Sequence, residues 1–510
     1  MKEIKYIIIL ITAALSFNSC SNAIDIYPVE NNTADQFYST DFQIKQAVMG
    51  AYARLGQNGT NTDFPTDFYY QASESRSDNL YYGSLANAQR DQVDLRLFQV
   101  TNVTGLNTAI YGRLYQLIKD ANNILYKAPV TYSRYRAEAS FLRALAYFEL
   151  VRAYGPQPVI TSPVTSEQAK ALPRQPIADV YAQIITDLKF AGDSLSPVYT
   201  GTEAGRVGSL AAKCLLGYVY VTMAGYPLND NTAYLKAEAV LSPIMTAVKA
   251  RFAPDYSYIF NVAKENTYDL FSVQFASGGN ALGSSLAGYV TSSGSSATSF
   301  PEWAYSGYTQ QGQDFRVDSV LVKKMKNAGD KRLTTSVAPG FWTKAVHGTT
   351  RADSVLYYST RNVIVKFLTK DNTNTTIKAW NDYPLNYPIL RPADAYLLYA
   401  EALVNNGKAA DAKQWIDAIR TRAGVAPLAA NPTMTDIMYE RRCEFLGEGK
   451  RYFDLVRMGE TTFVSTLKSF SDAYGHPLMG GIAPTKKDML LPIPLTVMNI
   501  NTSWIQNQDY

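Results

Sequence analysis

Residues Glu138–Tyr154 read EASFLRALAYFELVRAY, and this stretch decides the fold class. Its apolar side chains recur every three or four residues, which places them along one stripe of a helix. The stripe consists of Phe141, Ala144, Leu145, Phe148 and Val151. Gly155 and Pro156 follow directly and are typical of a helix end. The stretch therefore predicts a long amphipathic helix with one buried face.

The same helical period continues on both sides of this segment. The further predicted helices are Asp179–Leu195, Ser209–Ala224, Thr232–Val248, Ala393–Asn405, Ala409–Ala423 and Asp436–Arg457. Asn406, Gly407 and Lys408 form a turn between two of these helices. The resulting hairpin has about the size of one tetratricopeptide unit, although the full consensus of that repeat is not met. The pattern predicts a mainly α scaffold built from helix pairs.

Residues 256–380 differ from this scaffold in composition. Tyr256–Phe260, Asp269–Phe275 and Asn362–Leu368 are short apolar and aromatic segments that predict strands. Gly278–Ser299 is rich in Gly, Ser and Thr, which predicts a long loop. Because binding residues concentrate on long loops that a rigid scaffold positions, we expect this loop-rich, partly β insertion to carry function.

The N-terminus has the pattern of a secretory signal. Two lysines precede the apolar segment Tyr6–Leu15, which is too short to span a bilayer. Ser19-Cys20 closes the segment like a bacterial lipobox, although Phe17 and Asn18 depart from the stricter pattern. We expect residues 1–19 to be a signal peptide, Cys20 to be the lipidated mature N-terminus, and residues 20–36 to form a tether. The alternative is an ordinary secreted protein in which Cys20 is incidental.

Motifs of the common enzyme classes are absent from the sequence. It contains no Gly-x-Ser-x-Gly elbow, no His-Glu-x-x-His pair and no glycine-rich phosphate loop. His347 and His476 stand before Gly and Pro and read as turn residues. We therefore expect no catalytic residue and no cofactor. A glycosidase needs only two carboxylates, however, and the 44 acidic residues leave that reaction open.

Metal and nucleic-acid binding are also not expected. The three cysteines, Cys20, Cys214 and Cys443, lack the spacing of metal ligands or of a disulfide framework. The formal net charge is only +4, which argues against a polyanionic partner.

Segments in five parts of the chain together resemble one known family. They are Ala137–Pro158, Leu390–Ala402, Ile416–Gly424, Glu440–Arg457 and, at the C-terminal end, Leu491–Pro494 with Gln506–Tyr510. In this order behind a lipobox, they resemble the SusD/RagB family of nutrient-binding lipoproteins of Bacteroidetes outer membranes. Pro392 and Met458 are small departures, since an aromatic residue and Trp are usual there.

The resemblance implies a right-handed superhelix of tetratricopeptide-like helix pairs. Residues 37–255 would form an N-terminal helical region, and residues 256–510 would add the variable insertion and the C-terminal helical region, all packed as one globular unit. The best-matching charged residues stand among apolar neighbours, so we expect them to pair with each other and to be structural. These residues are Arg391, Asp394, Glu401, Arg420, Glu444, Arg451, Asp454 and Arg457.

The resemblance also implies a function and a partner. Such proteins bind a nutrient at the cell exterior and deliver it to a SusC-like TonB-dependent barrel transporter, over which they close as a lid. An oligo- or polysaccharide is the expected ligand, because most characterised relatives bind glycans. The sequence has 5 Trp but 37 Tyr, and this low Trp count keeps a peptide ligand open. A surface glycosidase and a helical adaptor without a small ligand are the further alternatives.

Two segments have the composition of a sugar site, since aromatic rings stack on sugar faces and polar side chains bind hydroxyls. They are Pro65–Tyr82 and, in the insertion, Ser299–Tyr308. The resemblance supports the first, because in relatives a loop just before the helix that matches Tyr111–Leu125 helps to form the glycan site. The expected ligand-binding residues are Trp303, Tyr305, Tyr308, Tyr81, Tyr82, Asp67, Arg76, Asp78 and Asn79. The alternative for each is ordinary loop packing.

Overall fold

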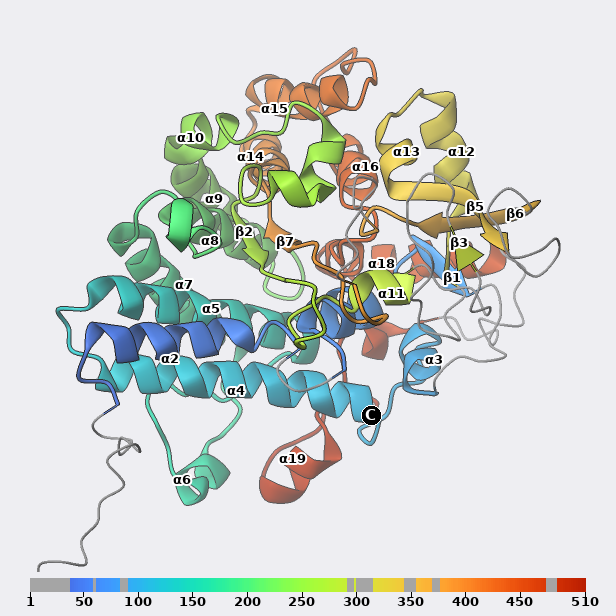
Figure 1. The fold of residues 1–510 in the computed structure, drawn as a ribbon. Helices are drawn as coiled ribbons and strands as arrows, with labels where there is room; N and C mark the ends of the chain where they lie inside the picture. The colour runs from blue at the N-terminus through green and yellow to red at the C-terminus, as the bar shows by residue number, and fades with distance from the viewer. Residues whose placement is uncertain are drawn as a thin grey trace, which may run out of the picture.

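The long helices of the N-terminal half pack side by side (Figure 1). The computed structural model describes residues 37–57, 61–82, 90–290, 298–299, 315–343, 355–368, 377–473 and 484–510. The helices of this half are α2 (Asp41–Ala53), α3 (Arg90–Arg96), α4 (Gly105–Lys127), α5 (Ser133–Tyr154), α6 (Ser166–Ala171), α7 (Ile177–Ser194), α8 (Ser209–Ala224), α9 (Ala233–Leu241) and α10 (Met245–Lys249). Because α4 contacts α5, α5 contacts α7, and α7 contacts α8, these four helices form one continuous stack.

The C-terminal helices extend the same stack. They are α14 (Pro392–Asn405), α15 (Ala409–Arg422), α16 (Met434–Glu444), α17 (Arg451–Arg457), α18 (Glu460–Ala473) and α19 (Leu495–Ile500). Although the insertion separates α9 from α14 in sequence, α14 packs directly against α8 and α9. The insertion therefore leaves the helical stack unbroken. In the described part of the chain, no helix combines the length and the apolarity needed to cross a bilayer.

The insertion forms small antiparallel sheets and short helices beside the stack (Figure 1). Its elements are β2 (Phe271–Val273), α11 (Leu286–Val290), β3 (Thr298–Ser299), β4 (Phe315–Val317), α12 (Ser319–Asn327), α13 (Arg332–Ser336), β5 (Val337–Thr343), β6 (Val355–Ile364) and β7 (Tyr387–Leu390). Strands β3, β5 and β6 form one sheet, β2 pairs with β7, and β4 pairs with β1 (Leu80–Tyr82) of the N-terminal half. The mainly α architecture with a partly β insertion is confirmed.

The predicted helices are present, but two of them are interrupted and one predicted loop contains a helix. Thr232–Val248 is broken at Ser242–Ile244 (η4), because Pro243 cannot continue a helix. Asp436–Arg457 is split into α16 and α17 around Gly447 and Gly449, which adopt φ of +84° and +69°. Gly278–Ser299 is not wholly a loop, since α11 lies within it.

The strand predictions in the insertion are correct only in part. Asp269–Phe275 contains β2, and Asn362–Leu368 overlaps the end of β6. Tyr256–Phe260 is instead a 3₁₀ helix (η5). The carboxylate of Asp255 accepts a hydrogen bond from the Ser257 backbone at 2.8 Å, which starts a helical turn at this point.

Helix α5 is buried on all sides and not on one face. Every residue from Ala137 to Tyr154 is buried, because α4, α7, α2 and α8 surround the helix. Its charged residues have ion-pair partners: Arg206 pairs with Glu138 at 2.8 Å, and Arg143 pairs with Asp187 at 2.6 Å. Pairing lets a helix that carries charges occupy the centre of a core.

A buried ion cluster joins the insertion to the C-terminal helices. Arg391, before α14, contacts Glu444 at 2.8 Å and Glu448 at 2.9 Å. The cluster, called here the central ion cluster, comprises Arg332, Lys366, Arg391, Arg422, Glu440, Glu444 and Glu448. The expectation that the best-matching charged residues are paired is confirmed for Arg391 and Glu444, and likewise for Arg457, which pairs with Glu401 and Asp454.

We expect Arg391→Met to lower the free energy of unfolding by about 3–5 kcal/mol, because it leaves Glu444 and Glu448 buried with too few counter-charges. Urea unfolding followed by circular dichroism measures the change. Lys170→Met is the control, since Lys170 pairs with Glu167 at 2.9 Å in an exposed position, and such pairs contribute at most about 1 kcal/mol. Equal effects of the two substitutions would show that the cluster does not stabilise the fold.

Acid should destabilise the protein through the same cluster. Burial opposes ionisation of Glu444, but Arg422, Arg391 and Arg332 together hold the pKa of its carboxyl well below the usual range. The pKa of Glu448 is also lowered, by Arg391 and Lys366 against its burial. Carboxyls with depressed pKa values stabilise the fold above their unfolded pKa of about 4.3, and this stabilisation is lost as the pH falls. We expect the urea concentration at the unfolding midpoint to decrease as the pH is lowered below about 5. This decrease should be less steep in Arg391→Met. A midpoint that is constant from neutral pH into this range would contradict the assignment.

Candidate functional site

The first predicted binding segment, Pro65–Tyr82, is not an open loop. It begins as a π-helix, η1 (Pro65–Ser73), continues as a 3₁₀ helix, η2 (Glu74–Arg76), and ends in β1. Every residue from Pro65 to Tyr81 is buried. Glu74 accepts hydrogen bonds from the backbone N–H groups of Gly447 (2.8 Å) and Gly449 (2.9 Å), so the segment is fastened to the turn between α16 and α17.

Asp67 lies inside the protein and contacts other side chains. Its carboxylate lies 3.4 Å from the guanidinium of Arg113 and accepts a hydrogen bond from Thr62 at 3.0 Å. Burial raises the pKa of Asp67 to about 7, even though the charge of Arg113 acts in the opposite direction. These contacts hold η1 against α4.

Arg76 is enclosed by aromatic rings. Its guanidinium carbon lies 4.6 Å from the ring centre of Tyr452 and 5.2 Å from that of Phe98. One of its amino groups donates a hydrogen bond to the backbone carbonyl of Asp488 at 2.9 Å. With 1% of its surface exposed, Arg76 joins η2 to the C-terminal segment.

Asp78 and Asn79 connect the same segment to α16 and α17. Asp78 accepts two hydrogen bonds from Arg451, at 2.7 and 3.0 Å. Burial disfavours the charge of Asp78, but Arg451 and Arg442 overcome this effect and lower its pKa to about 2. Asn79 donates to Glu74 at 2.8 Å and accepts from Arg442 at 2.8 Å. All four predicted polar residues therefore have protein partners that fix the shape of the segment.

β1, at the end of the first predicted segment, pairs with β4, which follows the second predicted segment in the chain. Tyr82 is opposite Phe315, and Tyr81 is opposite Arg316. The ring of Tyr81 is buried beside Phe470, with 6.5 Å between ring centres. Trp303, Tyr305 and Tyr308, and the side chain of Tyr82, lie outside the described residues.

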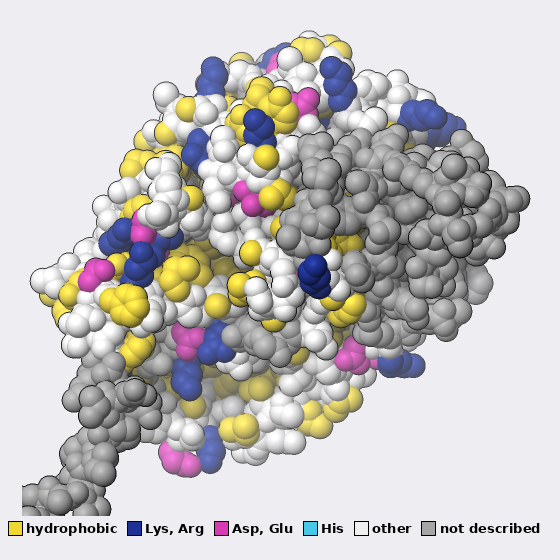
Figure 2. Space-filling model, viewed as in Figure 1, with side chains coloured by type: hydrophobic (Ala, Val, Ile, Leu, Met, Phe, Trp, Pro, Cys, Tyr) yellow, Lys and Arg dark blue, Asp and Glu magenta, His cyan; other side chains and the backbone are white. Residues whose placement is uncertain are grey.

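Metal ligands, reactive thiols and charged patches were the other candidate features among the described residues. Within the described ranges, no group of three or more His, Cys, Asp or Glu side chains is placed to hold a metal ion. Cys214 and Cys443 are buried, and burial raises the pKa of the Cys443 thiol to about 12, so both read as core residues. Figure 2 shows cationic and anionic side chains interspersed on the visible described surface. His347, His476 and Cys20 lie outside the described residues.

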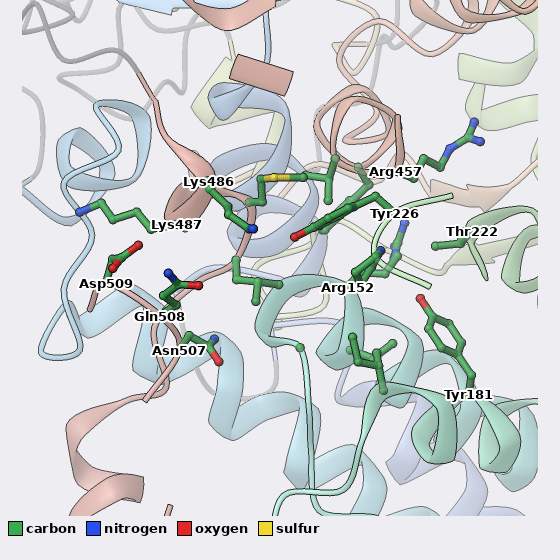
Figure 3. Close-up of a pocket in the computed structure, with 18 of the residues that line it drawn as sticks. Arg152, Tyr181, Thr222, Tyr226, Arg457, Lys486, Lys487, Asn507, Gln508 and Asp509 are labelled. Carbon is green, nitrogen blue, oxygen red and sulfur yellow. The ribbon is translucent and has the colours of Figure 1, made fainter. Parts of the chain in front are cut away.

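Sequence reasoning missed one feature, a pocket of about 210 Å³ at the opposite end of α5 from its N-terminus (Figure 3). Its walls come from α5, α7, α8, α17 and two C-terminal segments, 486–490 and 507–509. No local motif could have indicated it, because its residues range from Val151 to Asp509 and read individually as core or tail.

Comparison with known proteins identifies the fold. The model of the SusD family matches residues 254–510, and a model described as starch-binding and associating with the outer membrane matches residues 29–221. A SusD-like protein of Bacteroides ovatus is 25% identical over 476 residues, which cover 88% of this chain and 82% of the relative.

Solved structures agree with these matches. A SusD homologue from Bacteroides thetaiotaomicron superposes with a TM-score of 0.79 at 21% identity, covering 94% of this chain and 98% of its own. A laminarin-binding SusD-like protein superposes with a TM-score of 0.72 at 25% identity, covering 93% and 100%. Since the family model matches half of the sequence and the same fold spans nearly all of it, this protein belongs to the SusD/RagB family.

Proposed function

We propose that this protein binds an oligo- or polysaccharide at the cell surface and delivers it to a SusC-like TonB-dependent outer-membrane transporter. The observation that carries the proposal is the likeness over nearly the whole chain to a protein that binds laminarin, together with the starch-binding model that matches the N-terminal half. The protein would act by binding alone, without turnover of the glycan. The transporter partner follows from the family.

Lipidation of Cys20 would hold the protein on the outer membrane, facing the cell exterior. Two or more acyl chains on one residue anchor a protein stably, whereas one chain binds only marginally. The outer-membrane description of the matching N-terminal model supports this location. Residues 20–36 would then connect the lipid to α2.

The glycan site would lie at the edge where β1 meets β4. Trp303, Tyr305 and Tyr308 would stack on sugar faces, with Tyr81 and Tyr82 beside them at the end of the first segment. Asp67, Arg76, Asp78 and Asn79 would act by holding this segment in shape, since each already has a protein partner. Pre-organised loops of this kind reduce the entropy that binding would cost.

We expect a protein of residues 21–510, which includes all described residues, to bind one glycan class in a panel of polysaccharides and peptide pools. Trp303→Ala should weaken that binding by about tenfold or more, because stacked aromatic contacts contribute roughly 1–3 kcal/mol in comparable sites. Affinity electrophoresis and isothermal calorimetry measure the effect.

Tyr126→Ala is the matched control, since Tyr126 is 72% exposed in the last turn of α4. Its affinity should equal that of the parent protein. Binding of peptides alone would support the receptor role but contradict the glycan as its ligand. Hydrolysis of a bound glycan would show that the protein is an enzyme. If the two aromatic substitutions weakened binding equally, Trp303 would have no place in the site.

Cys20→Ser should release the protein from the membrane, because Ser cannot form the thioether that carries the lipid. We expect the parent protein in the outer-membrane fraction and the variant in the soluble periplasmic or culture fraction. Metabolic labelling with a fatty-acid analogue gives a second readout. An unlabelled parent protein that stays membrane-bound would exclude Cys20 as the anchor.

A further inference from the structure

The pocket at the end of α5 is a second candidate binding site, separate from the edge where β1 meets β4 (Figure 3). It holds about 210 Å³, which is enough for a small organic molecule. Neither predicted binding segment contributes a residue to its walls. Its ligand therefore has to be inferred from the side chains that line it.

The rim of the pocket is fixed by hydrogen bonds. The backbone N–H of Leu491 donates to the carbonyl of Ala153 at 2.6 Å, and the Asn507 amide donates to the carbonyls of Tyr154 (3.0 Å) and Leu491 (2.7 Å). On the other side, the backbone N–H of Tyr226 donates to the carbonyl of Arg457 at 2.9 Å. Gly225 makes this approach possible, since a Cβ there would lie 2.4 Å from the same carbonyl oxygen. The shape of the cavity is thus fixed by hydrogen bonds to backbone carbonyls of the folded protein.

The interior favours an apolar body. Val151, Ile177, Val456 and Leu490 line it together with aromatic rings. Two of its polar side chains already have partners: Arg152 donates to Glu149 and to the hydroxyl of Tyr218, and the Thr222 hydroxyl donates to a backbone carbonyl at 2.8 Å. A sugar would bury several hydroxyls with few free partners, which is costly. An aromatic or aliphatic body avoids this cost.

A polar head would find its partners elsewhere in the pocket. Figure 3 shows the Tyr226 hydroxyl and the Lys486 amino group pointing toward one another, and Lys487 lies on the same C-terminal segment. Lys486 is half-exposed and lies 3.4 Å from Glu460, a contact that is long and weak. Asp509 is the one acidic side chain among the lining residues. The Lys486 amino group and the Tyr226 hydroxyl therefore favour an anionic head with hydrogen-bond acceptors.

We propose that this pocket binds a small monocarboxylate with a single-ring apolar body. The ring would lie between the aromatic and aliphatic walls contributed by α5, α7, α8 and α17. The carboxylate would accept hydrogen bonds from Tyr226 and Lys486. This site is independent of the glycan site and of the proposed transport role.

The test uses 3-phenylpropanoate as the probe and its neutral amide, 3-phenylpropanamide, as the matched control ligand. Calorimetry on residues 21–510 should show one binding site for the acid and about tenfold weaker binding of the amide. Ile177→Trp should abolish binding of both, because the larger side chain fills the cavity. Ile185→Trp, also on α7 and equally half-buried but outside the pocket, should bind like the parent protein.

A second pair of variants tests the head group. Lys486→Gln should weaken binding of the acid about five- to tenfold and leave the amide unchanged. Lys170→Gln is its control, since Lys170 is equally exposed (48% against 50%) and also pairs with a glutamate. Thermal unfolding of every variant checks that the fold is intact.

Several results would overturn the proposal. No binding of the acid at millimolar concentration, or equal affinity of the acid and the amide, would rule out an anionic ligand for this pocket. Unchanged affinity in Ile177→Trp would place the ligand elsewhere on the protein. Binding of glucose or cellobiose that Ile177→Trp abolishes would make the pocket a sugar site.

Discussion

The requirement that buried charges be paired governs this fold. Arg391 is 1% exposed, and its guanidinium contacts Glu444, the last residue of α16, and Glu448, in the turn from α16 to α17. Lys366 and Arg332 of the insertion complete the same network. An unpaired charge at this depth would cost several kcal/mol, so the insertion, α14 and α16 must assemble together. The first predicted binding segment inherits its position from this constraint, because Glu74 accepts hydrogen bonds from the turn that the network holds.

Much of the helical scaffold could be predicted from the sequence, because helical periodicity is local. The limits of that prediction are also physical. Asp436–Arg457 has the period of one helix, yet a side chain at Gly449 would collide with the backbone of Tyr69, and this close approach forces a turn. Glu138–Tyr154 has the stripe of a surface helix, but its charged face is buried because Arg206 and Asp187 supply distant counter-charges. Neither partner is visible in a local window of sequence.

The candidate glycan site was less predictable for the same reason. Asp67, Arg76, Asp78 and Asn79 have the composition of a sugar-binding loop, which is also the composition of a paired and buried one. What separates the two readings is the position of residues far away in the chain: Asp488 for Arg76, and Arg451 for Asp78. The composition of a segment alone therefore cannot tell a sugar-binding loop from a buried and paired one.

The pocket at the end of α5 extends this argument to the core. Val151 belongs to the apolar stripe of the helix that decides the fold, and most members of that stripe pack against neighbouring helices. At the last turn the packing partner changes, because Gly155 ends the helix with φ of +73° and the C-terminal segment crosses at Leu490 and Leu491. A segment held by backbone hydrogen bonds cannot collapse onto the helix as a side chain would, and a cavity remains between them. The same apolar periodicity that builds the scaffold thus also lines a cavity, and only the tertiary packing distinguishes the two outcomes.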